Sequence, residues 1–153
     1  MRFNAQKSVL LCLCGILFSC AATQPLATPS GRPEVTVSAT VSRAQNVTID
    51  VMASNGYALT SQTSNALVFE KEMPPDQAML FLIGVGNSYS SQPKSIVRFI
   101  FTSSGGQVRI FGSIQASTQG PFGQTTNLDI TNGKSAQALQ TSLEALKQRI
   151  GQR

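Results

Sequence analysis

The sequence predicts an α+β domain, in which an antiparallel sheet of about five to six strands packs against two helices. A hairpin pattern with alternating apolar residues covers residues 95–116, and an amphipathic helical pattern covers residues 135–150 near the end of the chain. Shorter alternating runs, separated by turn residues, precede the hairpin. These patterns predict the order β-α-β-β-(α)-β-β-β-α within one domain, residues 34–153, with helices on one face of the sheet.

The first strand pattern begins at Glu34, after which apolar and polar residues alternate through Val41. Residues 43–55 fit either a helix or a strand. Ser42 and Gln45 have the spacing of a capping box, and Gly56 stands where a helix would end, so we favour a helix. A strand is the alternative, because apolar residues also alternate here and an Asn-Gly dipeptide follows.

Two further strands are expected over residues 57–61 and 66–72, on either side of a polar turn. Pro74, Pro75 and Asp76 can open a short helix over residues 77–85. The apolar run within this stretch also suits a buried strand, so both possibilities stay open. Glycines and polar residues from Gly84 to Pro93 indicate a loop.

The hairpin is the clearest pattern in the sequence. Its strands, residues 95–102 and 107–116, flank the turn sequence Ser-Ser-Gly-Gly. A symmetric four-residue turn pairs Phe101 with Val108 and Phe99 with Ile110 on an apolar face. After a Gly/Pro loop, residues 125–131 suit another strand. The last helix has apolar residues three or four positions apart: Ala136, Leu139, Leu143, Leu146 and Ile150.

The first twenty residues have the pattern of an export signal. Arg2 and Lys7 precede the apolar run 9–18, which is about half the ~20 residues needed to cross a bilayer, and Ser19-Cys20 follow. With Cys20 at the cleavage position, this segment resembles the lipobox signal of bacterial lipoproteins. The resemblance implies that residues 1–19 are removed and that Cys20 is acylated, so that Cys20 anchors the protein to a membrane. An ordinary secretory signal, cleaved around residues 19–22, is the alternative.

Residues 20–33 comprise the acylated cysteine and a flexible tether. The tether is expected because three prolines and small polar residues leave little apolar surface to bury. In Gram-negative lipoproteins, an Asp after the acylated cysteine signals retention in the inner membrane. Ala21 stands at this position, so the resemblance implies the outer membrane, with the domain facing the periplasm. The inner membrane is the less favoured address.

Composition argues against catalysis, metal binding and nucleic-acid binding. The chain has no His, the commonest general base near neutral pH, and the thiol left after processing is the one expected to be acylated. Glu70 and Glu72 share a strand face but suit a solvated edge. Two of the 12 basic residues leave with the signal, so the net charge against 7 acids is about +3, with no basic stripe. We expect no enzymatic activity, no metal or cofactor, and no nucleic-acid partner.

The second face of the hairpin is the candidate interaction surface: Arg98, Ile100, Arg109 and Phe111. Arginine and aromatic residues are enriched at protein interfaces. The alternative is that the first and last helices partly cover this face and the arginine side chains extend past them to solvent.

The element order is similar to that of small helix-grip domains, including those of outer-membrane assembly lipoproteins. This resemblance implies an accessory module of a cell-envelope complex for assembly, secretion or conjugation, with an envelope protein as partner. A small apolar-ligand or lipid-binding protein is the alternative function. An exposed hairpin face would favour the first, and a continuous apolar cavity beneath the last helix would favour the second.

Overall fold

The computed structural model describes residues 26–85, 91–120 and 122–152, so the predicted signal peptide and Cys20 lie outside the described residues. The described chain forms an α+β domain, as the sequence predicts. Its elements are β1 (Glu34–Val37), α1 (Val41–Ser54), β2 (Ala58–Gln62), β3 (Ala66–Glu72), α2 (Pro75–Val85), β4 (Lys94–Ser104), β5 (Gln107–Gln119), β6 (Thr125–Asp129) and α3 (Gly133–Gly151).

The six strands form one antiparallel sheet in the order β1-β5-β4-β3-β2. Strand β6 also pairs with β5, so β1 and β6 lie end to end along the same edge of the long strand β5. Strand β1 pairs with residues 108–111 and β6 with residues 115–119. The short interval between these two pairings is where the candidate site forms.

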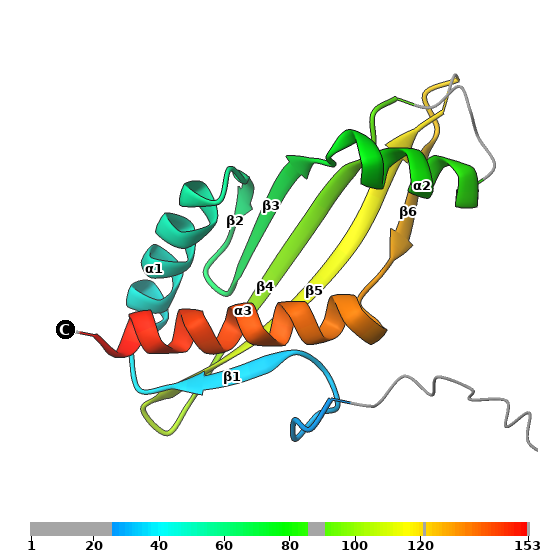
Figure 1. Ribbon diagram of the computed structural model, residues 1–153. Helices are drawn as coiled ribbons and strands as arrows, with labels where there is room; N and C mark the ends of the chain where they lie inside the picture. Colours follow the sequence, from blue (N-terminus) through cyan, green and yellow to red (C-terminus); the bar gives the residue numbers. More distant parts are fainter. Residues whose placement is uncertain (1–25, 86–90, 121, 153) are drawn as a thin grey trace, which may run out of the picture.

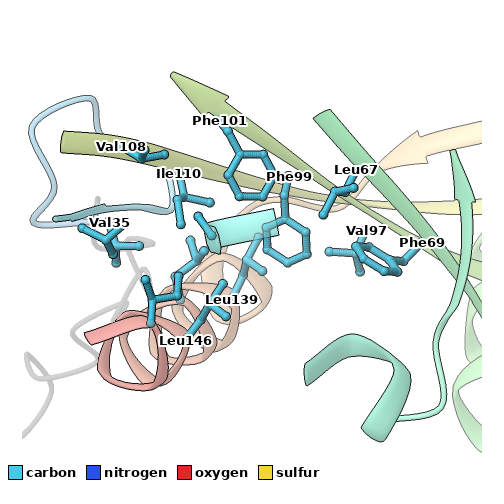
Figure 2. Close-up of a cluster of buried hydrophobic side chains, with 14 residues drawn as sticks. Val35, Leu67, Phe69, Val97, Phe99, Phe101, Val108, Ile110, Leu139 and Leu146 are labelled. Atoms are coloured by element: carbon cyan, nitrogen blue, oxygen red, sulfur yellow. The ribbon is translucent and has the colours of Figure 1, made fainter. Parts of the chain in front are cut away.

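The helices cover one face of the sheet. Helix α3 crosses in front of β4 and β5, with α1 beside it (Figure 1). Side chains from β3, β4 and β5 point toward Leu139 and Leu146 of α3 (Figure 2). Helix α2 packs on the same face through a smaller cluster that contains Ala78 and Ala116. The main core consists of Val35, Val37, Ala44, Leu67, Phe69, Val97, Phe99, Phe101, Val108, Ile110, Leu139, Leu143, Leu146 and Ile150.

The predicted hairpin register is wrong by two residues. The turn contains only Gly105 and Gly106, and Phe101 pairs with Ile110 rather than with Val108. Both glycines have positive φ angles, 58° and 77°, which suits the tight two-residue turns that match the twist of a hairpin. Because side chains alternate with a period of two, this shift leaves every residue on its predicted face.

Residues 43–55 adopt the favoured helix, but the predicted cap residue is wrong. Helix α1 begins at Val41, and the hydroxyl of Thr40 accepts a hydrogen bond of 3.2 Å from the N–H of Arg43. The extended backbone of Thr40 places its side chain over the first turn, which Ser42, inside the helix, cannot do. Strand β1 consequently ends at Val37, before the last residues of the alternating pattern.

The structure has a third helix, α2, in addition to the two helices that the predicted fold class contains. Helix α2 begins at Pro75 and settles the open choice between helix and strand for residues 77–85. Proline at a first helical position costs no hydrogen bond, because that N–H has no partner within the helix.

Helix α3 fixes the outer edge of β1. The side-chain amide of Gln140 accepts from the N–H of Glu34 at 2.8 Å and donates to its carbonyl at 3.0 Å. This pair of bonds satisfies backbone groups that would otherwise lie unpaired at a sheet edge. At Gly112 of β5, an added Cβ would lie 2.9 Å from Leu139 Cδ2, so glycine permits α3 to lie this close to the sheet.

The first prediction concerns the helix–sheet core. Leu143→Ala should lower the free energy of unfolding by about 2–5 kcal/mol, because the fully buried side chain leaves a cavity. Denaturant unfolding at neutral pH measures this change. The control Gln148→Ala alters an exposed position on the same helix and should have almost no effect. Equal stabilities of the two variants would contradict the packing described here.

Candidate functional site

The four residues of the predicted interaction surface share the face of the sheet opposite the helices. Ile100 pairs with Phe111, while Arg98 and Arg109 occupy neighbouring positions of the same face. Arg98 is exposed, Ile100 is 40% exposed, and the other two are half-buried. The alternative in which helices cover this face is wrong, since α1, α2 and α3 pack against the other one.

Residues 26–33, which precede β1, lie beside this face and make it concave. Together with the sheet they enclose a groove of about 690 Å³. Its walls include Leu26 and Arg32 on one side, and Arg98, Ile100 and Phe111 on the other. The groove continues to the N-terminus of α3 at Gly133, whose helix dipole adds positive potential.

The segment that forms this wall has a defined hydrogen-bonded conformation. The Thr28 hydroxyl donates to the carbonyl of Arg32 at 2.7 Å, and the N–H of Gly31 donates to the carbonyl of Thr28 at 3.0 Å. Ser30 donates through its hydroxyl to the Glu34 carboxylate at 2.7 Å. These bonds belong to the last part of the predicted tether, residues 20–33. The earlier part, residues 20–25, lies outside the described residues.

Glu34 is the acceptor that joins this segment to the sheet. Its side chain is almost fully buried, and Arg109 Nη2 lies 2.7 Å from its carboxylate. The hydrogen bond from Arg109 holds the pKa of Glu34 below its ordinary value; burial opposes this, and bonds from Ser30 add to it. The Arg109 guanidinium also lies 4.8 Å from the ring centroid of Phe111.

The two arginines of the predicted surface therefore have different roles. Arg109, itself half-buried, pairs with the buried Glu34 carboxylate, and replacing it would leave that carboxylate without its main partner. Arg98 makes no ion pair with any described residue and lines the groove beside exposed Ile100. Arg98 is thus the guanidinium that is available to a ligand, a distinction that sequence spacing does not reveal.

Two of the described acidic residues have hydrogen-bond or ion-pair partners within the protein. Glu70 of the interior strand β3 pairs with exposed Lys94 at 3.3 Å, and Asp129 accepts from the N–H of Thr131 at 2.7 Å. In the described part of the chain, no group of three or more potential ligands has metal-binding spacing.

Helix α2 presents an apolar surface that sequence reasoning missed. Met79, Leu80 and Ile83 are 65%, 73% and 68% exposed, although α2 buries Ala78 against the sheet. Large exposed apolar side chains that lie together mark interaction sites more often than a scattered single residue does. The uniformly apolar sequence 78–83 gave no indication of which side would face solvent.

A second hollow lies on the helix-covered face of the sheet. It occupies about 370 Å³ between α1 and α3, and Val97, Phe99 and Ile114 form its floor. This hollow opens between the two helices and has Thr48, Lys71 and Ser142 in its lining, so it differs from a continuous apolar cavity beneath the last helix.

The second prediction concerns the Glu34 ion pair. Because the pKa of Glu34 is lower in the folded protein, the ionised carboxylate stabilises the fold at pH values above its ordinary pKa of 4.5. This stabilisation is lost as the pH falls through the lower pKa of the folded state. Glu34→Gln should therefore be less stable than wild type at pH 7, and the difference should shrink below about pH 4.5. Urea unfolding across this pH range measures it. Glu72→Gln, which removes an exposed carboxylate at the end of β3, should instead keep the acid dependence of the wild type; a pH-independent gap for Glu34→Gln would contradict the assignment.

Comparisons with known proteins add no further constraint. No helix among the described residues combines the length and the apolar composition required to cross a bilayer. No family model matches the chain, and neither curated proteins nor solved structures give a significant match.

Proposed function

We propose that this protein is a membrane-anchored lipoprotein whose domain is a non-catalytic interaction module of a cell-envelope complex. The observation that carries the proposal is the open sheet face, where Arg98 lacks an ion-pair partner among the described residues and lies beside exposed Ile100. An arginine next to exposed apolar groups is a combination typical of protein interfaces.

The groove indicates the chemistry of the partner. Arg32 and Arg98 supply positive charge along its walls, and Leu26, Ile100 and Phe111 supply apolar contacts. The one acidic residue in its lining, Asp129, already accepts a backbone hydrogen bond. A protein segment with a carboxylate next to apolar side chains would complement this surface, because guanidinium groups bind carboxylates with two parallel hydrogen bonds.

The predicted anchor would keep this groove near the membrane. Only residues 21–25 separate Cys20 from Leu26 at the groove wall, and a fully extended chain of this length reaches about 20 Å. A partner would therefore meet the domain close to the bilayer. On this proposal the bilayer is the outer membrane, and the domain faces the periplasm.

The third prediction tests the anchor. Cys20→Ala should move the protein from the membrane fraction to the soluble periplasmic fraction, because it removes the acylation site. Immunoblotting of fractionated cells measures this, and mass spectrometry of the wild-type protein should find an acylated Cys20 at its N-terminus. Membrane retention of the variant, or an unmodified N-terminus in the wild type, would contradict the lipoprotein assignment.

The fourth prediction tests the groove. Arg98→Glu should reduce crosslinking to envelope partners several-fold in native membranes, since it reverses the charge of an exposed groove residue. Its circular dichroism spectrum should be unchanged, because Arg98 makes no ion pair in the described structure.

Arg149→Glu is the matched control, because Arg149 is exposed in the last turn of α3, outside the groove. It should crosslink like wild type. Identical crosslinking patterns for Arg98→Glu and wild type would remove the case for this surface. Arg109→Glu is unsuitable as a test, because it would place a second carboxylate against buried Glu34.

A further inference from the structure

The cleft between α1 and α3 arises because the two helices meet at one end only. At that end, the Arg43 guanidinium donates to the carbonyls of Ile150 and Gln152, at 3.2 and 2.6 Å. The opposite ends of the helices line a cleft of about 370 Å³ above β4 and β5. This volume lies within the range of roughly 300–1,000 Å³ that is usual for small-molecule sites.

Small side chains on α3 keep the cleft open. Ala138 and Ser142, one helical turn apart, line it and are exposed, whereas three of the buried positions of the same helix carry leucine: Leu139, Leu143 and Leu146. Val51 and Met52 of α1 form the opposite wall and are only half-buried. The cleft therefore presents apolar surface that the protein's own side chains do not cover.

One charged residue lines the cleft, the lysine at its rim. Lys71 Nζ donates to the carbonyl of Asn55 at 2.8 Å and lies 5.4 Å from the ring centroid of Tyr57. An ammonium group has three donors, so two remain after this bond. No carboxylate lines the cleft, and Lys71 makes no ion pair with any described residue. A negative head group would find complementary charge here, and a positive one would not.

We infer that this cleft binds a single-chain anionic amphiphile, with its hydrocarbon chain over the apolar floor and its head group at Lys71. The mainly apolar lining suits a hydrocarbon chain, and Lys71, the charged residue in that lining, suits an anionic head group. The carboxylate of a fatty acid and the phosphate of a lysophospholipid share the required chemistry. This site lies on the opposite face from the groove and does not depend on the proposed interaction function.

The test is calorimetric titration of the chain from residue 20 onward, which contains every described element. It carries Cys20→Ala so that no attached acyl chain competes. Dodecanoate, below its critical micelle concentration, should bind with saturation at one molecule per chain. Dodecyl lysophosphatidylglycerol, titrated in parallel, distinguishes the two sources of the head group. Dodecyltrimethylammonium should bind at least several-fold more weakly than dodecanoate.

Ser142→Phe should fill the cleft and weaken dodecanoate binding at least tenfold, with an unchanged circular dichroism spectrum. Ala145→Phe adds the same ring at an exposed position of α3 outside the cleft and should bind like wild type. If Ser142→Phe does not fold, Ala138→Leu is the milder filling variant. Lys71→Gln should weaken dodecanoate binding about two- to fivefold, the range of an exposed ion pair, and leave dodecanol binding unchanged.

The absence of saturable binding of both anionic amphiphiles would overturn the inference. So would equal affinity of the cleft-filling variant and wild type, or binding of the cationic amphiphile as tight as that of dodecanoate. An unchanged affinity of Lys71→Gln would overturn the placement of the head group.

Discussion

Burial of the sheet on one side only is the constraint on which the rest of the structure depends. Along β4 and β5, every second side chain enters the core beneath α3, and the residues between them must then lie on the other face. Phe99 and Phe101 in the core thereby place Arg98 and Ile100 at the surface. Among the described residues no helix packs on that second face, so its apolar and cationic side chains are accessible to a partner.

Polar contacts between residues far apart in the sequence stabilise the edge of the sheet at β1. Gln140 of α3 bonds both backbone groups of Glu34, and the Glu34 side chain receives Arg109 from β5 and Ser30 from the preceding segment. One residue thus connects a helix, two strands and the wall of the groove. A buried carboxylate that loses any of these donors would be costly, so the groove wall and the core are energetically linked.

The groove and the cleft differ in origin and chemistry. The groove exists because residues 26–33 fold beside a sheet face that the helices leave open, and it combines two guanidinium groups with apolar contacts. The cleft lies between α1 and α3 above the covered face, and its mainly apolar lining also contains Thr48, Ser142 and Lys71. Their positions on opposite faces would permit a protein partner and a small amphiphile to bind without competing for the same residues.

The sequence by itself determined the α+β class, the element order and the face on which each hairpin residue lies, because these follow from local periodicity. It predicted β3 and α3 closely, and it placed Arg98, Ile100, Arg109 and Phe111 together on one face. Only the tertiary structure decided that the turn at Gly105 has two residues, that Thr40 caps α1, and that Arg109 is engaged by Glu34 while Arg98 is not. The exposed side of α2 and both hollows were likewise undetermined, since an apolar run has no period that selects a face. The cap and the turn are local, but neighbouring residues offered more than one suitable position for each. The Arg109–Glu34 pair, the exposed side of α2 and both hollows depend on contacts between residues far apart in the chain, which local patterns do not specify.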